Sequence, residues 1–286
     1  MSNEPKPIFT VGGKSFTAVA INTAAKAGEW IKLKLGAHAS LTQKSTPHDL
    51  VTEVDKGSET MIRNLIKTHF PHHSILGEEG VAPGADASAK ALQEMQDDEY
   101  LWIVDPIDGT TNFVHGFPFF SVSIALAHRG EVIVGVVYDP NRDELFVAEK
   151  GKGAYVKGKP MHVSGEVKLS DALIATGFPA DSRHALPANM KGVQAVAPKV
   201  RNIRVAGSAA LHLAYVAAGR LSGFWEIGLN SWDIAAGALL VREAGGQVTD
   251  TAGQPYTLAV RHVLATNGAV HGELQTTLAE AGATGF

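Results

Sequence analysis

The sequence contains no cysteine, and this absence excludes several chemistries. Disulfide frameworks, thiolate zinc sites and cysteine nucleophiles all need a cysteine side chain. Long apolar runs are also missing, because none reaches the roughly 18 residues of a membrane-spanning helix. Residues 1–14 lack the basic segment followed by an apolar one that a secretory leader would have. We therefore expect a soluble, cytoplasmic protein with no membrane partner.

The chain also lacks a large excess of charge of either sign. The chain has 25 Lys and Arg against 29 Asp and Glu, a formal net charge of -4, and no block of like charges. A nucleic-acid-binding surface would need clustered Lys and Arg, so we expect no nucleic-acid partner. Hydrophobic residues make up 45% of 286 residues, which is enough for a large core in one layered domain or two fused ones.

Two hydrophobic patterns divide the chain. Residues 15–35 and the stretch around Met61 to Ile66 have helical spacing. Strand-like segments then follow at 74–77, 100–104, 121–130, 131–140 and 144–151, typical of a mostly antiparallel meander. The small, polar, acidic segment 81–100 is interpreted as a surface loop.

After about Gly165 strand and helix alternate, which favours an α/β arrangement. We predict an α+β half over residues 1–165 and an α/β half over 166–286, forming one continuous structural unit.

Two aspartates lie at the end of an apolar strand, in the stretch WIVDPIDGTTNFVHG at 102–116. Pro106 cannot donate to a sheet ladder, so Asp105 and Asp108 are predicted to flank an exit of the chain from the sheet. Both carboxylates could then face one crevice, where they would repel each other unless a cation lay between them. The alternative is turn chemistry, since Asp before Gly is a common turn pair.

Acidic residues at three other positions each have a structural interpretation that does not exclude a role in a shared site. Glu78 and Glu79 follow a short apolar strand, where α/β folds gather ligands, but they could also form a solvated loop. Asp55 is predicted immediately before the second helix, where it could be an N-cap. Asp233 is predicted in the first turn of a helix that ends at Gly245, a place where an Asp favours the helix dipole.

Taken together, these motifs resemble the inositol monophosphatases of the lithium-sensitive, magnesium-dependent phosphatase superfamily. The segments DLVTEVD, GEE, WIVDPIDGTTNFVHG and SWDIAAGALLVREAGG occur in that family's order and at roughly its intervals, over essentially the whole chain. The specific part is DPIDGTTNF with a downstream WDIAAG, whereas GEE alone would indicate nothing. The resemblance implies a layered αβαβα sandwich of the inositol monophosphatase/fructose-1,6-bisphosphatase type, and a homodimer.

The resemblance also implies two or three Mg²⁺ ions per site. The first ion would be held by Glu78, Asp105 and the carbonyl of Ile107, and the second by Asp105, Asp108 and Asp233. These are hard oxygen ligands, which suit Mg²⁺. In the family a hydroxyl and a carboxylate orient the attacking water, and Thr110 and Asp55 occupy those motif positions, while Glu79 would support this network or a third ion.

Substrate contacts are predicted from both halves. The backbone N–H groups of Gly109 and Thr110 are expected to bind a phosphate oxygen, as helix N-termini do, and a glycine allows close approach. By resemblance, Ser208, Ala209 and Glu226 would contact the inositol ring. The alternative for Glu226 is a strand-end carboxylate that faces water.

The predicted function is hydrolysis of an inositol monophosphate by metal-activated water. A related phosphatase acting on fructose bisphosphate, histidinol phosphate or a 3'-phosphonucleotide would keep the same metal carboxylates. A chain that has lost catalysis and serves as a metal-binding regulatory protein is the alternative from another class.

Overall fold

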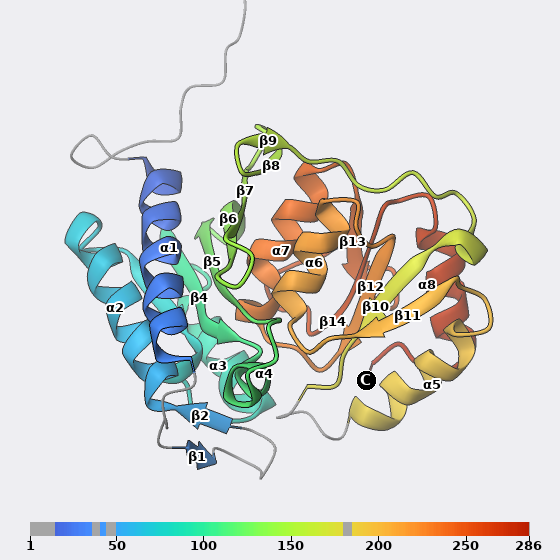
Figure 1. The fold of residues 1–286 in the computed structure, drawn as a ribbon, viewed down its shortest axis with the longest axis horizontal. Coiled ribbons are helices and arrows are strands. Elements are labelled where there is room, and N and C mark those ends of the chain that lie inside the picture. The colour runs from blue at the N-terminus through green and yellow to red at the C-terminus, as the bar shows by residue number, and fades with distance from the viewer. Residues whose placement is uncertain (1–14, 36–40, 44–49, 180–184, 286) are drawn as a thin grey trace, which may run out of the picture.

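The computed structural model describes residues 15–35, 41–43, 50–179 and 185–285, with backbone only for 41–43 and 50–52. Residues 1–14, in which no leader is expected, lie outside this range. The chain forms five layers: two helices, a seven-stranded sheet, two helices, a five-stranded sheet and two more helices (Figure 1). This arrangement confirms the predicted αβαβα sandwich. No helix in the described part of the chain is long and apolar enough to cross a membrane.

The first layer consists of α1 (Phe16–Lys34) and α2 (Glu53–His69). One face of α1 is buried, and small residues such as Ala20 lie on it. The antiparallel pair β1 (Leu41–Gln43) and β2 (Leu50–Thr52) precedes α2. The prediction that Asp55 stands before the helix is wrong, because β2 runs directly into α2 and Asp55 lies in the first turn.

The seven-stranded sheet has the order β3-β4-β5-β6-β7-β8-β9. Its strands are β3 (Ser74–Gly77), β4 (Tyr100–Asp108), β5 (Ser121–His128), β6 (Glu131–Asp139), β7 (Glu144–Glu149), β8 (Ala154–Val156) and β9 (Lys159–Pro160). The pair β3 and β4 is parallel and every later pair is antiparallel, so the predicted meander is confirmed.

Pro106 does not end β4, which differs from the sequence prediction. The strand continues to Asp108, but three steps of β4 span two steps of β5, since Asp105 faces Ser123 and Asp108 faces Ser121. On the other side, β3 ends opposite Val104. Pro106 therefore lies in an irregularity that is paired on one side only, where a missing N–H is tolerated.

Residues 85–95 form the helix α3 (Ala85–Met95), so the prediction of a loop across this segment is wrong. Its alanines, together with Lys90, Leu92 and Gln93, are strong helix formers. Leu92 is buried, and Met95 packs against the same core. The short 3-10 turn η1 (Glu78–Gly80) connects β3 to this region, and α4 (Thr110–His115) follows β4.

The third layer is the helix pair α6 (Ala209–Ala217) and α7 (Ser231–Glu243), which lies between the two sheets (Figure 1). Both helices are mostly buried, and a single core cluster joins residues of the first sheet, these helices and the second sheet.

The five-stranded sheet has the order β11-β10-β12-β14-β13, with parallel pairs between β10, β11 and β12 and antiparallel pairs to β14 and β13. The strands are β10 (Leu173–Thr176), β11 (Asn202–Val205), β12 (Gly223–Ile227), β13 (Gln247–Asp250) and β14 (His262–Thr266). The 3-10 turn η2 (Leu169–Asp171) precedes β10, and α5 (Leu186–Val196) and α8 (His271–Glu280) cover the outer face. The predicted alternation of strand and helix is confirmed.

Candidate active site

A cavity of about 420 Å³ lies where the end of β4 meets the N-termini of α6 and α7 and the end of β12. It collects most residues that the sequence singled out: Glu78, Asp105, Ile107, Asp108, Gly109, Thr110, Ser208, Ala209, Glu226 and Asp233. Asp55 and Glu79 are not among its lining residues. The cavity is therefore built from both predicted halves of the chain.

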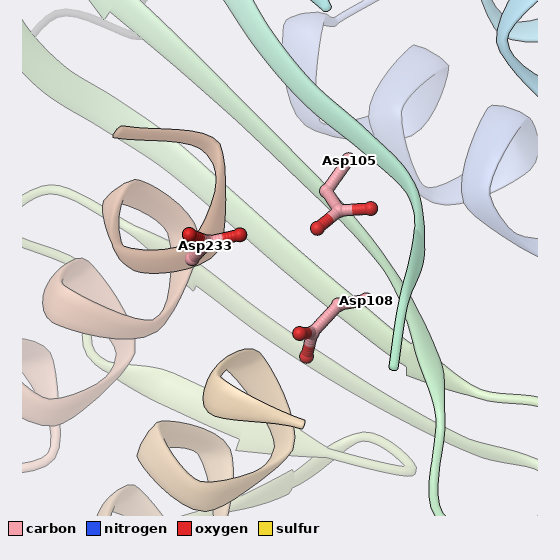
Figure 2. A group of neighbouring side chains, drawn as sticks. All are labelled: Asp105, Asp108 and Asp233. Atoms are coloured by element: carbon pink, nitrogen blue, oxygen red, sulfur yellow. The ribbon is translucent and has the colours of Figure 1, made fainter. Parts of the chain in front are cut away.

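Three aspartates converge in this cavity (Figure 2). Asp105 and Asp108 come from β4 and Asp233 from α7, and one carboxylate oxygen of each lies within 4.8 Å of the others. Asp105 and Asp108 are buried. Like charges this close repel strongly in a buried place, so the cluster has the character of a cation site.

Asp108 is held from across the cavity by the start of α6. The backbone N–H groups of Ala209 and Ala210 donate to its two oxygens at 3.2 and 2.9 Å, and the Ser208 hydroxyl also donates to it. Burial raises the pKa of Asp108 from 3.8 to about 6, although these hydrogen bonds act in the opposite direction. The helix N-terminus thus orients the carboxylate without fully offsetting the cost of burying its charge.

Asp105 and Asp233 are oriented by their own segments. The N–H of Ile107 donates to Asp105 at 3.0 Å, within the irregular end of β4. Asp233 is the third helical residue of α7, and its carboxylate accepts from the N–H of Asn230 at 2.7 Å in a capping box. The prediction that Asp233 lies in the first turn of a helix is confirmed, and the capping box directs this carboxylate toward the cluster.

Glu78 and Glu79 lie in η1, directly after β3. Glu78 lines the cavity, but it is not part of the three-aspartate cluster. The N–H of Glu79 donates at 2.8 Å to the carboxylate of Glu59, a buried residue of α2 that the sequence analysis did not identify. A charged residue with Arg63 four positions later is typical of a solvated helix face, so no sequence signal marked Glu59.

Thr110 connects the first helix layer to the cavity wall. Its hydroxyl lies 3.0 Å from a carboxylate oxygen of Asp55 and 3.1 Å from the carbonyl of Ile107. Asp55 is buried behind Thr110 and does not line the cavity. The predicted pairing of Thr110 with Asp55 therefore corresponds to a direct contact in the structure.

Gly109 occupies the N-cap of α4 with a left-handed φ of 97°. A Cβ there would lie 3.0 Å from the carbonyl oxygen of Gly207 and 3.1 Å from that of Phe119. Glycine is therefore needed for its backbone conformation and for the close approach of the two halves. Asn112 strengthens the same junction, because its amide donates to the carbonyls of Phe119 and Ala206 at 2.6 and 2.7 Å.

Glu226 lies at the end of β12 and is only 5% exposed, so the alternative of a carboxylate facing open water does not describe it. A side chain at Gly177 would overlap the Glu226 carboxylate. The mouth of the cavity also carries exposed apolar residues that the sequence analysis missed: Phe117, Phe178 and Val205.

The lining of the cavity fits divalent cations. Its ionisable side chains are carboxylates, those of Glu78, Asp105, Asp108, Glu226 and Asp233, and within the described residues no Lys, Arg or His lines it. Buried carboxylates need compensation by positive charge, and oxygen-only donor sets suit Mg²⁺. A cavity of this kind can hold a phosphate ester once cations neutralise its walls.

Comparisons with known proteins agree with this geometry. The profile of the family described as "Inositol monophosphatase family" matches residues 14–283. "Inositol monophosphatase 2" of Solanum lycopersicum is 46% identical over 260 residues, 89% of this chain and 94% of that relative. "Nus factor SuhB" of Pseudomonas aeruginosa is 42% identical over 265 residues, 91% of this chain and 94% of the relative. The crystal structure of extragenic suppressor protein suhB from Bartonella henselae has a TM-score of 0.83 at 38% identity, over 93% of this chain and 98% of that chain.

Proposed function

The chain belongs to the inositol monophosphatase family, and we propose that it is a Mg²⁺-dependent phosphomonoesterase that hydrolyses inositol monophosphate to inositol and phosphate. The predicted family and enzyme class, an inositol-phosphate phosphatase, are confirmed by the profile match and the relative named as an inositol monophosphatase. The metal ion and the individual substrate are the proposal.

The proposal of a metal-dependent reaction rests on the charge of the cavity, because the ionisable side chains that line it in the described part of the chain are all carboxylates. A phosphate ester is an anion, and walls made of Asp105, Asp108, Asp233 and Glu78 would repel it. Glu78, Asp105 and the carbonyl of Ile107 would hold one ion, and the three clustered aspartates a second, with Glu79 near a third. When bound, such ions supply positive charge to the phosphate and lower the pKa of a bound water.

The residues of the chain would orient the other reactants. The Thr110 hydroxyl donates to Asp55, which leaves its oxygen lone pairs to accept a hydrogen bond from the attacking water. The proton from that water can then pass through the Thr110 oxygen to the Asp55 carboxylate. The N–H groups of Gly109 and Thr110 would bind a phosphate oxygen at the start of α4.

The inositol part of the substrate would lie toward β12 and α6. The Glu226 carboxylate would accept hydrogen bonds from ring hydroxyls, and Ser208 and Ala209 would approach the ring from the start of α6. Ser208 and Ala209 also hold Asp108, so substrate contact and ligand orientation would meet at one helix end.

A phosphate-release assay with inositol 1-phosphate tests the proposal directly. We expect release with Mg²⁺, loss of release with a chelator, and recovery when Mg²⁺ is restored. Release that the chelator does not affect would refute metal dependence. Adding Li⁺ to the same assay tests the inhibition that the family resemblance implies.

A panel of phosphomonoesters separates the alternatives. Preferred hydrolysis of fructose bisphosphate, histidinol phosphate or a 3'-phosphonucleotide would assign another substrate to the same site. No release from any ester would favour a regulatory protein, a possibility worth testing because one relative is named "Nus factor SuhB" rather than a phosphatase.

The homodimer and the cytoplasmic location remain parts of the proposal that depend on the family resemblance and the sequence. Light scattering on the purified chain tests the dimer: twice the mass of 30.1 kDa is expected, and the mass of one chain would refute it.

A further inference from the structure

An ion pair in α2, with a buried carboxylate and a partly exposed guanidinium, contacts the turn that carries Glu78 and Glu79. The Glu59 side chain is only 5% exposed and accepts a hydrogen bond from Arg63 Nε at 2.8 Å, one helical turn later. Its second oxygen accepts from the N–H of Glu79 at 2.8 Å. A carboxylate withdrawn from water requires such partners, and one of them lies on the turn itself.

Arg63 forms a further hydrogen bond, to the strand that precedes the turn. Its guanidinium donates to the carbonyl of Ile75 at 3.1 Å, so α2 holds β3 before the turn while Glu59 holds the turn itself. The pair therefore fixes the backbone on both sides of Gly77. A solvated pair on a helix face would make neither contact.

Gly77 and Gly80 leave the room that this arrangement needs. A Cβ on Gly77 would lie 2.5 to 2.6 Å from the three carboxylate atoms of Glu59, and one on Gly80 would lie 2.8 Å from a terminal nitrogen of Arg63. Gly77 has an ordinary extended φ of -123°, so a side chain there is excluded by space and not by backbone strain.

We propose that Glu59 is a positioning residue, whose carboxylate fixes the η1 turn so that Glu78 faces the cavity as a metal ligand. The inference rests on the proposed function, because it assigns Glu59 a role toward the same metal site. Supporting partners of metal ligands set ligand orientation, and their loss typically lowers metal affinity about 10- to 100-fold.

Two variants perturb the contact between the Glu59 carboxylate and the η1 turn in different ways. Glu59→Ala deletes the carboxylate, and Gly77→Ala displaces it while keeping its charge. Glu94→Ala is the matched control, because Glu94 forms an i,i+4 pair with Lys90 at 3.9 Å on the exposed face of α3. If Glu59→Ala does not fold, Gly77→Ala carries the test alone.

Isothermal titration of Mg²⁺ into the chelator-treated full chain is the primary readout, with the thermal midpoint measured beside it. We expect Glu59→Ala and Gly77→Ala to weaken the tightest Mg²⁺ binding about 10- to 100-fold, and Glu94→Ala to leave it unchanged. In the phosphate-release assay the loss should appear in the Mg²⁺ concentration for half-maximal activity rather than in kcat at saturating Mg²⁺.

Wild-type Mg²⁺ affinity in both variants would overturn the inference, even with a lower thermal midpoint, because the pair would then only stabilise the fold. That result in an active enzyme leaves the proposed function intact. If the wild-type chain binds Mg²⁺ but hydrolyses no ester, the proposed function is refuted. The titration then still tests whether Glu59 affects Mg²⁺ affinity. A wild-type chain that binds no Mg²⁺ overturns both.

Discussion

The two walls of the cavity are built by different means. On the N-terminal wall, Asp105 and Asp108 lie on an irregular strand end, followed by a glycine with a left-handed backbone. On the C-terminal wall, regular helices α6 and α7 present their N-termini, and the first N–H groups of α6 hold Asp108. The first wall contributes three of the five carboxylates, and the second orients one of them, Asp108.

From this difference we expect the N-terminal wall mainly to set the reaction rate. The C-terminal wall should mainly set the orientation of Asp108 and the choice of alcohol. Changes on the N-terminal wall should remove charges or proton acceptors that act on the phosphate. On the C-terminal wall Asp233 is itself a proposed metal ligand, and changes at the other residues should alter how firmly Asp108 is held and which alcohol is accepted. Substitutions on each wall can break or sharpen this division.

The largest effect is expected for Asp105→Asn on the N-terminal wall, which should abolish measurable turnover while the fold survives. The substitution removes the ligand proposed to be shared by two ions. Steady-state phosphate release, with circular dichroism as the check on folding, measures this. Near-normal turnover in a folded variant would refute the two-ion assignment.

Thr110→Val should lower kcat about 100-fold, because the hydroxyl that contacts Asp55 and would orient the attacking water is lost. Thr110→Ser keeps the hydroxyl and is the matched control, with activity close to wild type. Equal losses in the two variants would show that the methyl group or the packing matters and the hydroxyl does not.

Glu226→Gln on the C-terminal wall should change specificity more than rate. We expect kcat/KM to fall more for inositol 1-phosphate than for glycerol 2-phosphate, because charged hydrogen bonds to ring hydroxyls are weakened. The difference corresponds to a loss of about 1–3 kcal/mol in transition-state stabilisation. Competition between the two esters gives the ratio directly. Equal losses on both would make Glu226 structural.

Ser208→Ala should weaken Mg²⁺ binding about 10-fold, because the hydroxyl that donates to Asp108 from the C-terminal wall is lost. Ser121→Ala is a matched comparison from the N-terminal wall, where the hydroxyl lies 3.4 Å from the same carboxylate. We expect a smaller effect there. The opposite order would contradict the division of labour between the walls.

The smallest effect on activity is expected for His212, which lies behind the C-terminal wall in α6. Within the described residues neither ring nitrogen has a hydrogen-bond partner, and burial lowers the pKa of His212 from 6.5 to about 3. Below pH 6.5 the unfolded chain binds a proton that the folded chain does not, so the free energy of unfolding falls as pH decreases from 6.5 toward 3. His212→Leu should reduce this dependence.

The thermal midpoint of wild type and His212→Leu between pH 4 and 8 checks this. Some dependence should remain, since burial also lowers the pKa values of His73 and His271 to about 4. The ring nitrogens of His271 lie 3.0 Å from the hydroxyls of Thr249 and Thr266, so His271 is the paired counterpart. Parallel pH curves for wild type and His212→Leu would contradict the prediction.

The elements with strong local patterns could be predicted from the sequence. The strand expected at 131–140 and the first-turn position expected for Asp233 depend on neighbouring residues, and both were found where expected, in β6 and α7. Helix α3 was missed because its composition is small and polar, it buries few residues, and Gly84 gives no side-chain cap. Its packing beside β3 is a tertiary effect that no local pattern shows.

Contacts across the cavity were beyond the reach of local reasoning. Ser208 lies 100 residues from Asp108 in the chain, so a helix start and a strand end meet only in the fold. The motif resemblance placed both residues at one site, but it did not predict that α6 would hold the carboxylate. The burial of Glu59 was hidden for the same reason, since it depends on the packing of η1 against α2.

The two walls of the cavity are proposed to share a metal site. Crystals of the chain grown with Mn²⁺, an ion that accepts the oxygen ligands of Mg²⁺, would test it through anomalous difference density. We predict one peak bound by Asp108 and Asp233 from opposite walls and a second bound by Glu78, with Asp105 contacting both. The absence of any peak that contacts both walls, or no density in the cavity at saturating Mn²⁺, would contradict this assignment.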